Sequence, residues 1–195
     1  MGRWAKDNGS DFEYPPVGTH VARCFKIIDI GTQHGEINGQ AKTRNQILVY
    51  WELPNEKMQD GSIFIVSKFY TNSVNEKSNL CKDLEAWRGG IKFTDKEREG
   101  FDLSAILGKP CMLSVTAKKS GDGTQVGAVM AVPKGMTVPV QVNPSFTFWI
   151  DEWDQQKFDS LSDKMKMLIA KSDEYINRPV GTKNNEVPAG SGVPF

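Results

Sequence analysis

Cations and aromatic rings recur at alternate positions along two segments whose composition is typical of β-strands. Arg44 and Tyr50 fall in one alternate set of the first segment, and Lys68 and Tyr70 fall in one alternate set of the second. Because successive side chains of a strand point to opposite faces of a sheet, we expect the members of each set to share a face. Cations bind phosphate groups, and flat rings stack on bases whatever their sequence. The pattern therefore predicts a surface that binds single-stranded nucleic acid.

Apolar residues occur in both alternate sets of these strands, so a second interpretation stays open. In the second segment the proposed outer set also contains Phe64 and Val66, while Ile65 and Phe69 fall in the inner set. Phe64 and Val66 fit equally well beneath a loop or helix, and exposed positions of any strand are often Lys, Arg or Tyr. On this interpretation the cations and rings belong to an ordinary solvent-exposed face.

Five further cations extend the candidate surface. Two lie at the tip of the last predicted hairpin, where they continue the groove: Lys118 and Lys119. Three lie on or near a predicted helix, away from its apolar stripe, where they fit the backbone of a bound strand: Lys77, Lys82 and Arg88. Acidic residues are interspersed with these three, so a solvated helix face is the alternative interpretation.

The residues of common catalytic and metal sites are sparse. The histidines are His20 and His34, and the sequence has no GxSxG, P-loop or GxGxxG motif. Its three cysteines, Cys24, Cys81 and Cys111, are widely spaced and form no CxxC pair. We interpret them as reduced thiols packed in the core or in a helix. The sequence therefore predicts a binding protein with no enzymatic activity, metal or cofactor.

Composition and charge place the chain among soluble globular proteins of one domain. Its 195 residues are 38% apolar and 25% charged, with a net charge of 0. Neutrality argues against coating nucleic acid by bulk positive charge but is compatible with a local basic groove. No apolar run reaches membrane-spanning length, and Met1–Asp11 lacks the apolar stretch of a signal peptide. We expect a cytoplasmic protein.

The order of predicted elements is three strands, a helical insertion and a two-stranded hairpin. The predicted strands are Thr19–Ile30, Arg44–Leu53, Ile63–Tyr70, Cys111–Ala117 and Gln125–Val132. Gly31–Gly39 reads as a polar turn region, and an apolar stripe at Leu80, Leu84 and Trp87 predicts the helix. This order predicts a mainly β fold, a five-stranded barrel of the OB type. An SH3-like barrel is the nearest competitor, but it places no substantial helix between strands three and four.

The chain divides into four predicted regions. Residues 1–13 form a flexible N-terminus, residues 14–150 the OB-fold domain, residues 151–176 a helical appendage and residues 177–195 a disordered tail. Met165, Leu168 and Ile169 mark the apolar face of the C-terminal helix expected in the appendage.

Two stretches carry a resemblance to a known family. They are Ser67–Thr71 leading into Glu76–Gly89, and Gly100–Leu103 leading into Leu107–Cys111. They resemble a family of bacteriophage proteins of this length that bind single-stranded DNA in replication and recombination. The likeness covers most of Gly18–Tyr175. It implies an OB-fold and, for a phage protein, the cytoplasm of the host cell.

The last residues of the sequence resemble the tip of bacterial single-stranded DNA-binding proteins. In that family an acidic tail ends in an apolar residue, Pro and Phe, which dock on replication and repair partners. The resemblance implies that replication or recombination proteins bind the matching residues here: Val193, Pro194 and Phe195. The sequence departs from the pattern because Glu186 is the only acid near the tip.

A protein-interaction module is the alternative function. The neutral charge and the apolar members of the outer face favour a phage adaptor or an inhibitor that uses the OB face on a host protein. Sequence alone leaves open whether the chain forms a homo-oligomer and whether it prefers DNA to RNA.

Overall fold

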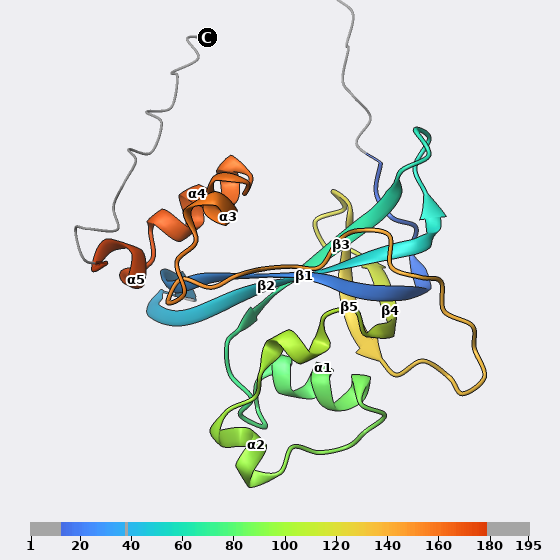
Figure 1. Cartoon of the computed structure of the whole chain (residues 1–195), viewed down its shortest axis with the longest axis horizontal. Helices are drawn as coiled ribbons and strands as arrows, with labels where there is room; N and C mark the ends of the chain where they lie inside the picture. The colour runs from blue at the N-terminus through green and yellow to red at the C-terminus, as the bar shows by residue number, and fades with distance from the viewer. Residues whose placement is uncertain (1–12, 38, 179–195) are drawn as a thin grey trace, which may run out of the picture.

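A long antiparallel hairpin forms the centre of the fold. The computed structural model describes residues 13–37 and 39–178. The hairpin strands are β1 (Gly18–Ile37) and β2 (Gln40–Lys57), and β3 (Ile63–Thr71) pairs antiparallel with β2 (Figure 1). On its other side β1 pairs with β4 (Pro110–Ala117), which pairs with β5 (Thr124–Met130). The strand order is β3-β2-β1-β4-β5, and a three-residue strand, β6 (Phe146–Phe148), lies parallel to β1.

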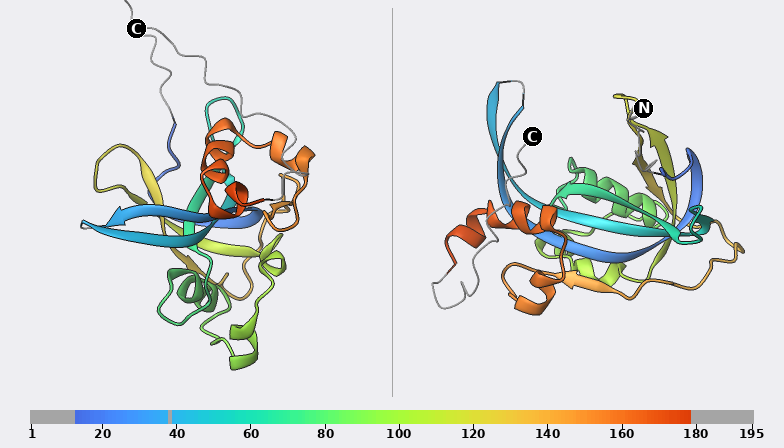
Figure 2. Two further views of the ribbon diagram at one scale, coloured as in Figure 1. Left: turned by 90° about the vertical axis from the view of Figure 1, so that its left-hand side faces the viewer. Right: turned by 90° about the horizontal axis from the view of Figure 1, so that it is seen from above.

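Helices lie on both sides of this sheet (Figures 1 and 2). Between β3 and β4 the chain forms α1 (Asn79–Trp87), α2 (Asp95–Glu99) and the 3₁₀ helix η1 (Leu103–Ile106). After β6 it forms α3 (Gln155–Asp159), α4 (Asp163–Ala170) and α5 (Asp173–Ile176). Ser78 caps α1 by accepting a hydrogen bond from the backbone N–H of Cys81. Within the described residues, no helix is long and apolar enough to cross a membrane.

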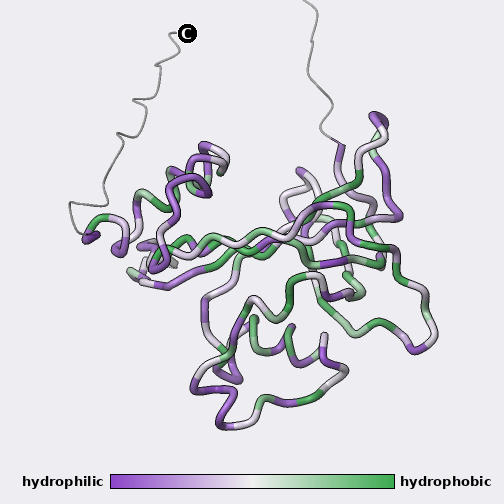
Figure 3. Tube along the Cα trace, in the orientation of Figure 1, coloured by the Kyte–Doolittle hydropathy of each residue, from purple (hydrophilic) through white to green (hydrophobic). Residues whose placement is uncertain are grey.

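Each side of the sheet packs its own apolar core. Residues of β1, β2 and β3 meet α1 and η1 in the larger core, whose members include Val49, Trp51, Val66, Tyr70, Leu80, Leu84 and Ile106. The smaller core joins β1 and β2 to the C-terminal helices through Ile30, Leu48, Phe148, Phe158, Met165 and Ile169. Figure 3 shows apolar stretches along the strands and in α1. Since β1 and β2 contribute to both cores, these strands are buried on both faces over part of their length.

The mainly β fold and the helical insertion between the third and fourth strands are confirmed. The strand count was wrong, because the aromatic cluster after Pro144 contains a sixth strand, β6, too short to show a periodic pattern. In the described residues the sheet is open, with β3 and β5 at the two ends of its hydrogen-bonded path. The C-terminal appendage holds three short helices rather than one, with the predicted stripe on α4.

The turn predicted at Gly31–Gly39 was wrong, because β1 continues to Ile37. Gly31 has a φ of +67° and sits where the β1–β2 register shifts, so it marks a bulge inside the strand. A Cβ added at Gly31 would lie 2.5 Å from Glu174 Oε2 and 2.7 Å from Ser172 Cβ. Glycine is therefore required at this position by the close approach of α5, and the hairpin beyond it forms a projecting arm.

The three cysteines are free and buried, as predicted. Burial raises the pKa of the Cys24 thiol from about 9 to about 12 and raises the pKa of Cys111 well above its ordinary value. A hydrogen bond from the Lys26 backbone opposes the shift at Cys24 but is outweighed by the loss of hydration. Both thiols are therefore neutral in the folded protein at pH values where an unfolded thiol ionises.

We expect the free energy of unfolding to fall as the pH rises above about 9. The unfolded thiol loses its proton there while the folded thiol keeps it, so alkaline pH favours the unfolded state. For Cys24 the loss is about 1.4 kcal/mol per pH unit until its folded pKa of about 12 is reached. Urea unfolding at several pH values measures this slope. The double variant Cys24→Ala/Cys111→Ala should have a shallower slope, and an unchanged slope would contradict the assignment.

Candidate nucleic-acid interface

The pairing of β2 with β3 decides which side chains share a face. Val49 pairs with Lys68, and Ile47 pairs with Tyr70. Since directly opposite residues project to the same face of a sheet, Lys68 and Tyr70 face the core that packs on α1. The prediction that they share the outer face with Tyr50 was wrong. Both alternate sets of β3 are apolar enough to be buried, so the pattern alone could not choose between them.

Tyr70 is a core residue rather than a stacking platform. Its side chain is 3% exposed and lies edge-on to Trp51, with ring centroids 6.5 Å apart. Its hydroxyl donates a hydrogen bond of 2.6 Å to Asp83 Oδ2 on α1. Burial, together with the nearby Asp83 charge, raises the pKa of Tyr70 well above its usual range. A base has no access to this ring.

Lys68 joins the two ends of the open sheet. Its Nζ lies 2.7 Å from Asp83 Oδ2 and donates a 3.0 Å hydrogen bond to the Gly127 carbonyl on β5. The same Nζ lies 5.2 Å from the centroid of the Tyr70 ring. Lys68 therefore holds β3, α1 and β5 together across a seam that has no strand pairing among the described residues. Because its ammonium group is already paired with Asp83 and the Gly127 carbonyl, Lys68 is not suited to binding a phosphate.

Two other predicted site residues have partners inside the protein. Arg88 Nη2 lies 2.8 Å from Glu97 Oε1, and its guanidinium stacks 4.8 Å from the Phe93 ring centroid. The half-buried Tyr50 ring lies 5.3 Å from Lys26 Nζ, which also approaches Phe146. Burial raises the pKa of Tyr50 and lowers that of Lys26. Arg88 therefore ties α1 to α2, and Tyr50 lies partly covered beside the second core.

The remaining predicted cations lie at the surface in three separate places. Lys118 and Lys119 are exposed at the β4–β5 turn, and Lys82 is exposed on α1. Arg44 and Lys77 line one pocket of about 370 Å³, at the edge strand β3. The structure thus brings two of the predicted cations together.

An exposed aromatic ring lines the same pocket. Phe69 is 47% exposed and belongs to the outer face, because it pairs with Leu48. Gln46 of β2 and Asn79, the first residue of α1, also line the pocket. The alternation predicted Phe69 on the inner face and Tyr70 on the outer face. The exposed ring that could stack on a base is therefore Phe69, and the predicted site residue Tyr70 is buried.

A second pocket of about 140 Å³ adjoins the first and shares Arg44 and Gln46 with it. It adds Lys42, which falls at an alternate position of β2 and therefore on the same face as Arg44 and Gln46. Lys42 is absent from the predicted site residues because it lies between the predicted turn at Gly31–Gly39 and the predicted strand that begins at Arg44. We call the combined surface the β2–β3 groove, defined by these residues: Lys42, Arg44, Gln46, Phe69 and Lys77.

The groove has an excess of positive charge. Among the described residues, Lys42, Arg44 and Lys77 have no carboxylate within ion-pair distance, and Glu36 is the one acid lining either pocket. Helix α1 begins at the groove and has no acidic residue in its first turn. The positive end of its dipole adds to the local potential. The groove is therefore suited to binding anions.

The arm that carries Arg44 is fixed by the C-terminal helix α5. Glu174 accepts hydrogen bonds of 2.6 Å from both the backbone N–H and the hydroxyl of Thr32. It also accepts one of 3.1 Å from the side chain of Asn45, the neighbour of Arg44. His34 on the arm lies 2.8 Å from Asp173. The arm is therefore held in place independently of any ligand.

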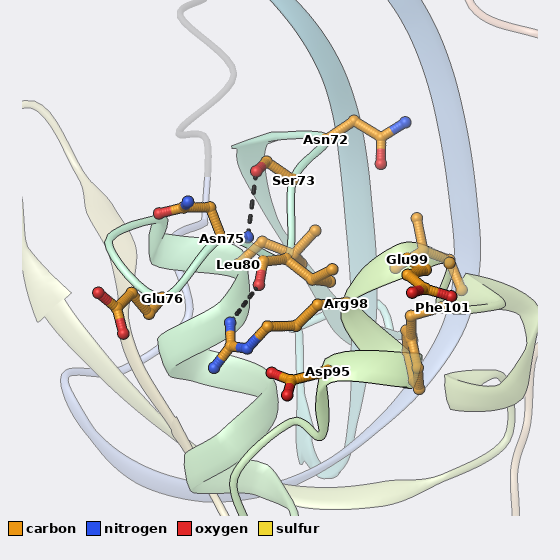
Figure 4. Close-up of a pocket in the computed structure, with 12 residues that line it drawn as sticks. Asn72, Ser73, Asn75, Glu76, Leu80, Asp95, Arg98, Glu99 and Phe101 are labelled. Atoms are coloured by element: carbon orange, nitrogen blue, oxygen red, sulfur yellow. Dashed lines mark hydrogen bonds between the residues drawn. The ribbon is translucent and has the colours of Figure 1, made fainter.

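Another pocket, of about 630 Å³, has the opposite charge character (Figure 4). Glu76, Asp95 and Glu99 line it, and Arg98 donates to the Val74 carbonyl at 2.7 Å and lies 3.4 Å from Glu85. The Arg98 guanidinium therefore already has partners within the protein, Val74 and Glu85, and does not offset the acidic residues of the pocket. Among the described residues no group of three or more His, Cys, Asp or Glu side chains could hold a metal ion. An acidic pocket of this kind repels a phosphate backbone.

No known protein family matches this chain. A search of curated proteins also finds no match. What the groove binds is therefore inferred from its own residues. The predicted partner-binding residues Val193, Pro194 and Phe195 lie outside the described residues.

Proposed function

We propose that this chain is a non-enzymatic single-stranded DNA-binding protein that binds its ligand in the β2–β3 groove. The observation that carries the proposal is the pocket that two unpaired cations, Arg44 and Lys77, line together with the exposed ring of Phe69. Cations that track phosphates beside a ring that stacks on bases are the common elements of single-strand binding. A role in phage replication or recombination rests on the resemblance of Ser67–Thr71 and Glu76–Gly89 to that family.

The proposal includes an OB-type fold. The strand order β3-β2-β1-β4-β5, with a helix between β3 and β4, supports a partly open five-stranded barrel to which β6 is added. The Lys68 contact with Gly127 brings the two ends of the path together where an OB barrel closes. Strands two and three carry the usual nucleic-acid surface of this fold, and the β2–β3 groove lies on the same two strands.

Two features favour a single strand over a duplex. A base can stack on Phe69 only when it is unpaired, because pairing and stacking in a duplex cover its flat faces. The chain has a net charge of 0, so its positive charge is local and does not match the long phosphate array of a duplex. Weak binding to duplex DNA is therefore expected.

Salt dependence tests the proposal. Titration of a labelled single-stranded oligonucleotide should show affinity that falls with salt, and Arg44→Ala and Lys77→Ala should each flatten the slope by about 0.7. Each variant removes one phosphate contact and the counterion release that accompanies it. Lys164→Ala, an exposed lysine on α4, is the matched control and should keep the wild-type slope.

The proposal fails if duplex DNA binds more tightly than the single strand, or if Arg44→Ala and Lys77→Ala behave like the Lys164→Ala control.

One observation favours a protein-interaction module as the second candidate. Val140 and Val142 are 80% and 62% exposed on a connector held to β2 by Glu52, which accepts from the Val142 N–H. Fixed apolar side chains of this kind suit a protein partner.

A further inference from the structure

Two side-chain amides border the pocket beside Phe69 without making a hydrogen bond to another described residue. They are Gln46 and Asn79. Asn75, in the same pocket, differs because its Oδ1 already accepts from the Lys77 backbone N–H at 3.0 Å. Each free amide offers a donor and an acceptor to a ligand.

The register places Gln46 within reach of anything that stacks on Phe69. Gln46 pairs with Thr71, and Leu48 pairs with Phe69, so Gln46 and Phe69 are diagonal neighbours on one face. Diagonal neighbours are roughly 7–8 Å apart at their Cα atoms, a span that the two side chains cover. The edge of a base stacked on Phe69 therefore lies beside the Gln46 amide.

The cations lie at the border of the same pocket. Arg44 precedes Gln46 by two residues on the same face of β2, and Lys77 lies just before the Ser78 cap of α1. One pocket of about 370 Å³ thus combines a ring, free amides and unpaired cations, which match the base face, base edge and phosphate of one nucleotide.

We propose that this pocket binds one unpaired nucleotide of the strand and reads the edge of its base through Gln46 and Asn79. This inference rests on the proposed function and goes beyond sequence-tolerant binding, because it assigns a base preference to one position of the bound strand. An amide that pairs with the preferred base is left unsatisfied by a base whose edge does not match.

Competition among four oligonucleotides of equal length, each containing one kind of base, tests the inference. Wild-type protein should prefer one of the four by at least about fivefold over the weakest. Gln46→Ala and Asn79→Ala should reduce this preference, because the amides that read the base edge are removed while phosphate contacts and stacking remain. Gln125→Ala, an exposed glutamine on β5, is the matched control and should keep the preference.

The outcomes separate this inference from the proposed function. Equal binding of all four oligonucleotides, or a preference that survives in Gln46→Ala and Asn79→Ala, overturns base reading while single-strand binding stands. Failure of all four oligonucleotides to bind the wild-type protein overturns both.

Discussion

Replacing Phe69 with alanine is expected to weaken binding of single-stranded DNA by about 1–3 kcal/mol, roughly five- to 150-fold. The loss arises because the ring offers an exposed flat face inside the β2–β3 groove, in the pocket that Arg44 and Lys77 also line. Since Phe69 is 47% exposed and belongs to neither apolar core, the thermal stability of the protein should change little. Fluorescence anisotropy of a labelled oligonucleotide measures the affinity.

Ile91→Ala is the control for the loss of an exposed apolar side chain, since Ile91 is 60% exposed and lines neither pocket of the groove. Its affinity should equal that of the wild type. A folded Phe69→Ala variant with wild-type affinity would show that the ring does not stack on a base.

Replacing Tyr70 with alanine should instead destabilise the fold, by about 3–5 kcal/mol. The side chain is 3% exposed, packs on Trp51 and donates its hydroxyl hydrogen bond to Asp83, so its removal leaves a cavity and takes away one of the two hydrogen bonds that Asp83 Oδ2 accepts. Tyr70→Phe, which removes the hydroxyl alone, should cost about 1 kcal/mol. Urea unfolding measures both changes.

Alanine substitutions at the adjacent residues Phe69 and Tyr70 are thus expected to have different effects. The first should weaken DNA binding, and the second should lower the free energy of unfolding. If Tyr70→Ala remained as stable as the wild type while losing DNA affinity, the assignment of β3 faces would be wrong. The comparison is sharp because adjacent residues of one strand must lie on opposite faces.

Element order was predictable from the sequence because each element carries a local signal. Turn residues and runs of β-branched residues mark the strands, and the stripe at Leu80, Leu84 and Trp87 marks α1. The three buried thiols followed from the absence of paired spacings. These features depend on residues that are close in the sequence, so local sequence patterns are enough to predict them.

The face of β3 depends on its pairing with β2, which local patterns do not contain. The register shifts between Leu53 and Lys57, so counting back through the loop does not give the pairing. The seam contact of Lys68 is equally non-local, because its partners Asp83 and Gly127 lie on two other elements. From the sequence alone, Lys68 near Tyr70 is interpreted as a surface residue, because its partners are not visible in the local pattern.

Glu52 illustrates the same limit on the second strand. It falls in the predicted outer set, yet its carboxylate is fully buried and accepts hydrogen bonds from Val142 N, Asn143 N and Asn143 Nδ2. The connector that covers it comes 90 residues later in the chain. Three donors satisfy the buried carboxylate, but two of them are backbone N–H groups, and local sequence patterns do not show that this connector lies against β2.

Photocrosslinking tests most directly whether the β2–β3 groove is the binding site. A single-stranded oligonucleotide carrying 5-iodouracil, irradiated with the full-length wild-type protein and analysed by mass spectrometry, should form its main adduct on Phe69, which is the exposed ring lining the groove. The adduct should be lost when an unlabelled single strand competes and retained when a duplex is added at the same concentration. Adducts confined to the β4–β5 turn around Lys118 and Lys119, or to the acidic pocket around Glu76 and Asp95, would contradict the assignment.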